Sequence, residues 1–162
     1  MRILNFFRVD IIKGSINAIA IVLLLVPLFI PIVRVTGNSM SPTFRDGDII
    51  VLLPKFQIEA GDICCFKIKN SIYVKRIIAF GNSIVDIDCS GNITVDNSMV
   101  SEGIYLEKNC VKFPYTVPKD CVFVMGDNIQ NSFDSRYKNF QEIHSSDVIG
   151  IAFRIFRSGT YR

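Results

Sequence analysis

The chain has 162 residues, which is enough for one domain of ordinary size with a core of its own. Its formal net charge is only +3 and its basic residues are scattered, so the composition argues against a nucleic-acid partner. Its five cysteines show neither C-x-x-C spacing nor a histidine at zinc-finger distance, which argues against a metal site.

The first element in chain order is an apolar run, Ile16–Val33, whose 18 residues carry no charge. A helix of that length spans about 27 Å, close to the hydrocarbon thickness of roughly 30 Å. Pro27 and Pro31 are tolerated in a membrane helix. A cleaved signal peptide is the alternative, but its apolar core is normally shorter, and "PIVRVTG" offers no small-x-small cleavage site. We therefore expect one permanent N-terminal transmembrane helix.

Charges beside the apolar run predict its orientation. Arg2, Arg8 and Lys13 precede it and are opposed only by Asp10, and a basic excess marks the cytoplasmic side of a membrane span. The small positive net charge of the chain also suits contact with anionic membrane lipid. The expected order is a cytoplasmic tail (1–14), a single-pass anchor in the cell membrane (15–34) and an extracytoplasmic domain (35–162).

After the apolar run, the pattern changes to short segments rich in β-branched and aromatic residues, most of them bounded by Gly, Asp, Asn or Pro. The sequence "CSGN" (89–92) predicts a hairpin turn, and 137–147 is compatible with one helical turn. The pattern predicts an all-β domain of antiparallel strands, in a folded-over sheet or partly open barrel. The predicted strands are 47–54, 61–69, 71–80, 84–88, 92–95, 121–125 and 148–156.

Export would place the cysteines in an oxidising compartment. A disulfide between Cys110 and Cys121 would then close a loop around "FPYTVP". The alternative is that the cysteines are free and buried, and their spacing does not decide between the two.

The segment "GNSMSPTF" (37–44) places Ser39 just after the apolar run. A serine there either caps a turn or acts as a nucleophile, and a nucleophilic serine needs a base. His144 would provide a Ser-His-Asp triad together with an aspartate such as Asp147, although a histidine in a polar loop is usually a surface residue. A lysine with a lowered pKa is the other possible base.

Lys75 is the best candidate for such a lysine, because it lies in the middle of the apolar strand "SIYVKRIIAF". Alternation along the strand places Tyr73, Lys75 and Ile77 on one face and Arg76 on the other, so at least one of the two cations should face the interior. Burial would lower the lysine pKa, and a fall of about 2–3 units costs about 3–4 kcal/mol. The alternative is that the Lys75 side chain extends to the surface beside Arg76.

Five motifs occur in an order and spacing that resemble the type I signal peptidases, the membrane-anchored Ser/Lys proteases of bacterial type. They are "SMSPTF", "GDIIVL", "GDICCFKIK", "YVKRIIAF" and "GDNIQNSFDSR". The hairpin "IVDIDCSGNITVDN" and the closing "DVIGIAFRIF" are also similar to that family, so the resemblance covers about Arg34 to Phe156. It implies an all-β fold in which Ser39 is the nucleophile and Lys75 the general base.

The resemblance also implies roles for other residues. Ser132 would hydrogen-bond and orient the lysine, while Asp134 and Arg136 would form a structural ion pair that holds their loop against the site. Asp127 would be architectural. The residues that match the substrate pockets and the turn around the nucleophile are Val35, Thr36, Gly37, Met40, Pro42, Phe44, Tyr73 and Val74.

Gly37 is a departure from part of the family, because some members carry a serine there whose hydroxyl helps to bind the oxyanion. The oxyanion would then rest on the Ser39 N–H and another group. The implied activity is that of a membrane-bound serine endopeptidase, without a cofactor, that cleaves signal peptides from exported preproteins after small residues.

Three alternatives remain open at this point. A peptidase specialised for pilin or conjugation proteins would share the Ser/Lys chemistry. A self-cleaving repressor of the SOS-response type would share the chemistry but lacks the apolar run. A catalytically inactive membrane-bound assembly factor lies outside the enzymes, and the joint presence of Ser39, Lys75 and Ser132 argues against it.

Overall fold

The computed structural model describes residues 16, 17, 20, 21, 31–54, 57–103, 109–140 and 142–156. The chain divides into two compact units, Met1–Pro31 and Ile32–Arg162. In the first unit Ile16, Asn17, Ala20 and Ile21 are helical. Among the described residues, none of the helices combines the length and apolar character needed to cross a bilayer. The predicted tail and most of the predicted anchor lie outside the described residues.

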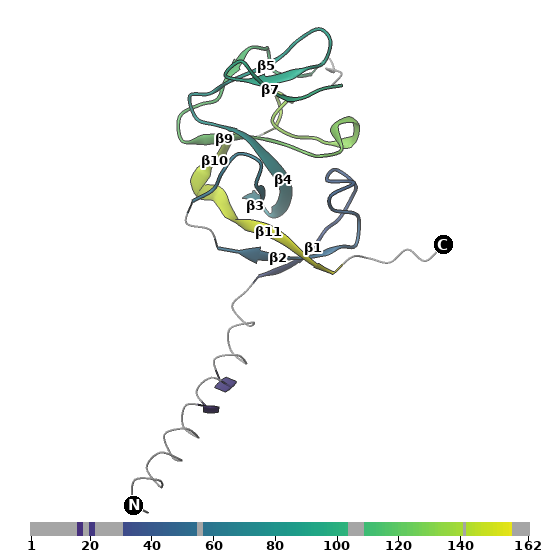
Figure 1. Ribbon diagram of the computed structural model, residues 1–162, viewed down its shortest axis with the longest axis vertical. Helices are drawn as coiled ribbons and strands as arrows, with labels where there is room; N and C mark the ends of the chain where they lie inside the picture. The colour runs from purple at the N-terminus through teal and green to yellow at the C-terminus, as the bar shows by residue number, and fades with distance from the viewer. Residues whose placement is uncertain are drawn as a thin grey trace, which may run out of the picture. The chain divides into compact units, whose positions relative to one another are not determined.

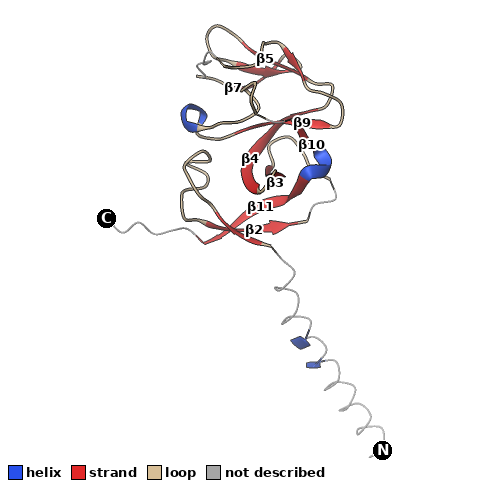
Figure 2. Ribbon diagram, turned by 180° about the vertical axis from the view of Figure 1, so that it is seen from behind, coloured by secondary structure: helices blue, strands red, loops and turns tan. Residues whose placement is uncertain are grey.

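The second unit consists of two antiparallel sheets, as predicted for an all-β domain (Figure 1). The seven-stranded sheet has the order β1-β2-β11-β3-β4-β9-β10, and the four-stranded sheet has the order β7-β6-β5-β8. Figure 2 shows the four-stranded sheet at the end of the domain away from β2. The bounds are β1 Ile32–Arg34, β2 Ile49–Leu53, β3 Ile63–Ile68, β4 Ser71–Phe80, β5 Ile84–Ile87, β6 Ile93–Val95, β7 Ser98–Ser101, β8 Tyr115–Thr116, β9 Cys121–Met125, β10 Ile143–His144 and β11 Val148–Phe156.

All seven predicted strands are present, and the turn at 89–92 joins the antiparallel pair β5–β6 as expected. The segment 137–147 contains a short 3-10 helix, η3 (Ser145–Asp147). The short strands β1, β7, β8 and β10 were not predicted. Their length of two to four residues is too small for a pattern of alternation to stand out.

Strand β1 corrects the predicted end of the anchor. Ile32, Val33 and Arg34 pair with Val51, Ile50 and Ile49 of β2, so these residues belong to the sheet. The prediction extended the membrane segment to residue 34 because a short apolar strand and the end of an apolar helix have the same hydropathy.

Three hydrophobic clusters hold the domain together. One packs Ala79 and Phe123 of the large sheet against Val85, Ile87 and Ile93 of the small sheet. A second centres on Phe66, Ile77 and Val124 inside the large sheet. The third underlies the segment that contains Ser39, with Val35, Met40, Phe44, Ile50, Leu52 and Cys65 as its buried members.

The cysteines are free thiols, so the structure does not contain the disulfide considered for Cys110 and Cys121. Cys64 and Cys65 lie in β3 with no exposed surface. Burial raises the pKa of each of these two thiols to about 12, which keeps them protonated and unreactive near neutral pH.

Candidate active site

Ser39 lies in a loop between β1 and β2 that is fastened to the core on both sides. Met40 and Phe44 are buried in the third hydrophobic cluster. The backbone folds back on itself, because the N–H of Ser41 donates to Asn38 O at 3.1 Å and that of Phe44 donates to Met40 O at 2.8 Å. Ser39 itself is partly exposed, so it is accessible while the segment that carries it is held in place.

Gly37 allows the backbone to turn into this loop. Its φ of +84° lies in the left-handed region, which favours glycine. Its N–H donates to Asp46 Oδ1 at 2.8 Å. The Gly37 N–H is therefore already occupied and does not serve as a second donor to an oxyanion.

Lys75 is buried, with 3% of its surface exposed, which overturns the alternative of an extended surface lysine. It lies in the middle of β4 and is paired with Cys64 of β3. Arg76 turns to the opposite face, as the strand alternation predicted. Its Nε and Nη2 atoms donate to the two carboxylate oxygens of Asp127 at 2.8 and 2.6 Å.

The Lys75 amine has a polar partner in Ser132, whose Oγ accepts a hydrogen bond from Nζ at 2.9 Å. Burial lowers the pKa of Lys75 below its ordinary value. The carboxylate of Asp134 acts in the opposite direction, and the guanidinium of Arg136 adds to the lowering. An uncharged amine is the form that can accept a proton from a serine hydroxyl.

The loop after β9 supplies Ser132 and is held by a buried ion pair. Arg136 Nε donates to Asp134 Oδ1 at 2.8 Å, and Nη2 donates to Oδ2 at 3.0 Å. The same Nη2 reaches the carbonyls of Ile129 and Ser132. Asp134 also accepts the Gly126 N–H at 3.0 Å. These bonds join both ends of the loop, so they fix where Ser132 stands relative to β4.

Ser39 and Lys75 line one pocket of about 410 Å³. Of the predicted pocket residues, Val35, Thr36, Met40, Tyr73 and Val74 line it, whereas Gly37 and Phe44 do not. Phe44 instead lies behind the pocket wall in the third cluster. Five other residues that line the pocket were not predicted, namely Val33, Arg34, Ser71, Ile72 and Phe133.

His144 does not belong to this pocket. It lines a different cavity on the side of β9 and β10, where its Nδ1 lies 3.8 Å from Cys121 Sγ. This placement gives no support to a Ser-His-Asp triad, and it leaves Lys75 as the base candidate beside Ser39.

Three residues of the site were missed by the sequence analysis. Arg76 fastens Asp127, Gly126 packs against Ser132 and the backbone of Ser39, and Asn128 donates to the backbone on either side of Ser39. The "GDN" turn that contains two of them was visible in the sequence. Turns of small polar residues are common between strands, however, and their composition alone does not predict which distant backbone groups they contact.

Comparison with known proteins identifies the family of the chain. The family model described as "Signal peptidase, peptidase S26" matches residues 8–156. The chain belongs to the signal peptidase family, peptidase S26. It is therefore a serine endopeptidase of that membrane-associated family.

Individual relatives show the extent of the similarity. Signal peptidase I P of Bacillus subtilis subsp. natto is 31% identical over 167 residues, which cover 91% of this chain and 88% of that protein. Signal peptidase I of Bacillus amyloliquefaciens is 36% identical over 125 residues, which cover 67% and 66%. A solved signal peptidase I from Enterococcus faecalis V583 has a TM-score of 0.47 and 24% identity, and the match covers 59% of this chain and 96% of that one.

Proposed function

We propose that this peptidase removes signal peptides from exported preproteins by cutting after a small residue, with Ser39 as nucleophile and Lys75 as general base. The observation that carries the proposal is the buried Lys75 amine, which is hydrogen-bonded to Ser132 in the pocket that Ser39 also lines. Burial of an amine beside a serine has little structural benefit and a clear chemical use.

In the proposed reaction, neutral Lys75 takes the hydroxyl proton of Ser39, and Oγ bonds to the carbonyl carbon of the scissile amide. The negative charge that develops on the carbonyl oxygen is stabilised by the N–H of Ser39. The Lys75 ammonium then returns its proton to the leaving amine as the C–N bond breaks. Lys75 next activates a water, which attacks the acyl ester and regenerates the Ser39 hydroxyl.

The shape of the pocket supports a preference for small side chains. Val35, Met40, Tyr73 and Val74 line it, and Met40 and Val35 are themselves fixed in the core. These two side chains cannot move to make room for a large substrate side chain without disturbing the core packing around them. Alanine-sized residues at positions −1 and −3 of the substrate therefore suit the site.

The proposed location is the outer side of the cell membrane, with a single-pass anchor and a cytoplasmic N-terminus. The uncharged run Ile16–Val33 and the basic residues before it support this topology. Exposed apolar side chains on β1 and β11, namely Ile32, Phe153 and Phe156, support contact with lipid by the catalytic domain. Enzyme and substrate would then meet at one interface.

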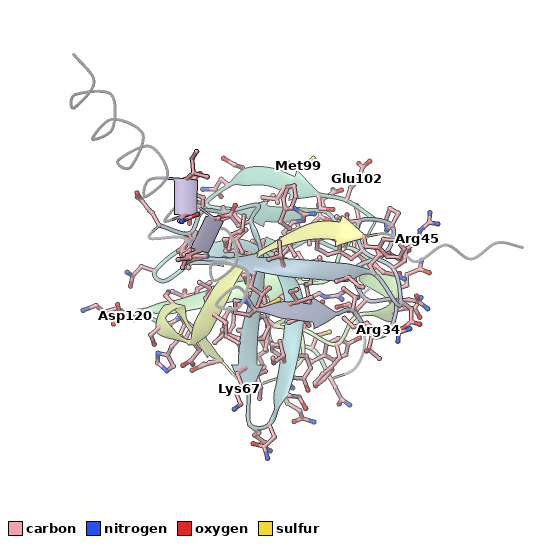
Figure 3. All side chains as sticks on the ribbon, turned by 90° about the horizontal axis from the view of Figure 1, so that it is seen from below. Arg34, Arg45, Lys67, Met99, Glu102 and Asp120 are labelled. Atoms are coloured by element: carbon pink, nitrogen blue, oxygen red, sulfur yellow. The ribbon has the colours of Figure 1, made fainter. Side chains whose placement is uncertain are left out.

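The test is cleavage of a preprotein by the wild-type chain, Ser39→Ala and Lys75→Ala, all purified in detergent. Each substitution should abolish detectable cleavage. Ser146→Ala and Lys67→Ala are matched controls at exposed positions, and Lys67 points outward from the hairpin of β3 and β4 (Figure 3). A rate within about threefold of wild type for either active-site variant would reject the Ser/Lys assignment.

A second measurement separates general secretion from a specialised role. Mass spectrometry of secreted N-termini after depletion of the enzyme should show many uncut signal peptides. A change confined to one pilin-like or conjugation protein would favour specialised processing. Unchanged N-termini, together with defective assembly of surface fibres, would favour the inactive assembly factor.

A further inference from the structure

Asn128 holds the backbone on both sides of the nucleophile. Its side-chain Nδ2 donates to Asn38 O at 3.0 Å, and its backbone N–H donates to Ser39 O at 2.9 Å. We refer to these two hydrogen bonds as the Asn128 clamp. They connect the loop after β9 to the loop after β1, segments that are 90 residues apart in the sequence.

The first bond of the clamp acts on the peptide unit that supplies the proposed oxyanion donor. Asn38 O and the Ser39 N–H belong to the same trans peptide, so they point in opposite directions within one plane. Fixing the carbonyl toward Asn128 therefore fixes the N–H toward the other side. In the part of the chain that the structure describes, the Ser39 N–H donates to no protein acceptor, so it stays available.

The second bond acts in the same way on the next peptide unit. Ser39 O accepts the backbone N–H of Asn128, which fixes the plane of the peptide between Ser39 and Met40. With both planes held, the Ser39 Cα has little freedom to rotate. Asn38 O also accepts the Ser41 N–H at 3.1 Å, so its position is shared between two donors.

We infer that Asn128 is a positioning residue for the oxyanion hole, which it aims by clamping the peptide that carries the Ser39 N–H. The inference rests on the proposed function, since it presumes that Ser39 attacks a carbonyl. Asn128 does not line the pocket of Ser39 and Lys75, so it acts through the backbone and not on the substrate. The orientation of the Ser39 N–H matters in this chain because position 37 is glycine and supplies no side-chain hydroxyl to the oxyanion.

The test compares Asn128→Ala and Asn128→Asp with the wild-type chain in detergent. Asn128→Asp keeps the size of the side chain and the backbone N–H but removes the donor to Asn38 O. Gln130→Ala is the matched control on the neighbouring exposed position of the same loop. For each protein we would measure kcat and KM on a preprotein, the pH profile, and inhibition by a peptide boronic acid, which forms an anionic tetrahedral adduct with a serine hydroxyl.

Removal of one oxyanion donor lowers the rate by about 10²–10³-fold. A donor that is present but wrongly oriented should lower the rate by a smaller factor. We expect kcat to fall about tenfold in both variants while KM stays within about twofold. Affinity for the boronic acid should fall by a similar factor. In Asn128→Ala the midpoint of the pH profile should not move, because neither hydrogen bond of the clamp involves Lys75 or Ser132. Asn128→Asp is not used for this comparison, because its new negative charge acts on the Lys75 pKa directly. Gln130→Ala should match wild type in every measurement.

Several outcomes would overturn the inference. They are a kcat within twofold of wild type in both variants, an unchanged affinity for the boronic acid, or a shift of the pH midpoint in Asn128→Ala, which would indicate displacement of the lysine. If Asn128→Ala does not fold, Asn128→Asp alone decides, because it preserves the volume. Failure of the proposed function is recognised separately: Ser39→Ala would then still cleave the preprotein, whatever Asn128 does.

Discussion

A buried lysine, Lys75, is the residue on which the proposed chemistry depends, and its protonation also affects stability. The ordinary pKa of the amine is 10.5, and burial lowers it in the folded protein. The unfolded chain therefore binds more protons than the folded one between the folded pKa and 10.5. Stability contributed by this group rises with pH in that window and is smallest below the folded pKa, where a charged amine is held in the core.

The first prediction follows from this sign. Lys75→Met removes the buried charge, so the variant should be more stable than wild type at pH 6, and its advantage should shrink as the pH rises toward 10. Urea denaturation of both proteins at a series of pH values measures the difference, and other titrating groups cancel in the comparison. An advantage that is constant with pH would show that Lys75 does not titrate in this range.

Gly126 shows how a single missing side chain positions the site. A Cβ at this position would overlap with Ser132 Oγ and with the backbone O of Ser39. The backbone oxygen cannot move aside cheaply, because it already accepts the Asn128 N–H. Glycine is therefore required by close approach between the two loops.

The second prediction is that Gly126→Ala displaces Ser132 or Ser39 and lowers kcat by about 10²-fold, which is the cost of a misplacement on the order of 1 Å. Gly103→Ala adds the same methyl group in open space, and it should retain activity although its φ of +79° makes the substitution locally strained. Cleavage of a preprotein by the two variants gives the comparison. A Gly126→Ala enzyme as fast as Gly103→Ala would mean that the loops accommodate the methyl group.

At the scale of elements, the site is a junction between β4, the loop after β1 and the loop after β9. Arg76 of β4 binds Asp127, and its Nη1 donates to the carbonyl of Gly61. The buried ion pair of Asp134 and Arg136 closes the loop upon itself. Both pairs stiffen the elements that carry Lys75 and Ser132, so they contribute to preorganisation as well as to stability.

The third prediction concerns this ion pair. Asp134→Asn leaves the Arg136 guanidinium buried without its counter-ion, which should lower the free energy of unfolding by about 3–5 kcal/mol. It also removes the carboxylate that raises the pKa of Lys75, so the pH–rate profile should move to lower pH. Asp147→Asn, at an exposed position, is the control. A profile that moves to higher pH would contradict the assigned electrostatics.

At the scale of the whole molecule, one edge of the domain is apolar and exposed. Ile32 of β1 and Phe153 of β11 both pair with Val51 of β2, so they form one row across three strands. Ile32 is 62% exposed, and Phe153 and Phe156 are each 59% exposed. Exposed apolar rows of this kind indicate contact with a partner surface, and lipid is the partner we propose.

The fourth prediction tests that contact. The double substitution of Phe153 and Phe156 by serine should slow cleavage of a membrane-inserted preprotein in liposomes by about tenfold, because burying a phenylalanine contributes about 1.5–3 kcal/mol. Cleavage of a short soluble peptide should be unaffected. Met99→Ser is the control, since Met99 is exposed on the other sheet (Figure 3). Equal losses on both substrates would indicate damage to the site instead.

The sequence by itself determined seven of the eleven strands, the family, and the alternation that places Lys75 and Arg76 on opposite faces of β4. These depend on local patterns: alternation along a strand, turn residues at its ends, and motifs in a fixed order. Short strands such as β1 and β10 were not predicted, because two or three residues are too few to show a periodic pattern. The start of the sheet at Ile32 was not predicted for the related reason that hydropathy does not distinguish a short apolar strand from the end of an apolar helix.

Only the tertiary structure decided which groups meet. The Arg76–Asp127 pair and the Asn128 clamp join residues 51 and 90 positions apart and were not predicted, whereas the Lys75–Ser132 bond, 57 positions apart, was expected from the family resemblance alone. Such contacts depend on how β4 and β9 pair and on where two loops cross, and no spacing in a single sequence encodes that. The same reason explains the free cysteines and the separation of His144 from Ser39. Strand alternation and turn residues depend on neighbouring positions in the sequence, whereas the distance between two side chains depends on how the whole fold packs.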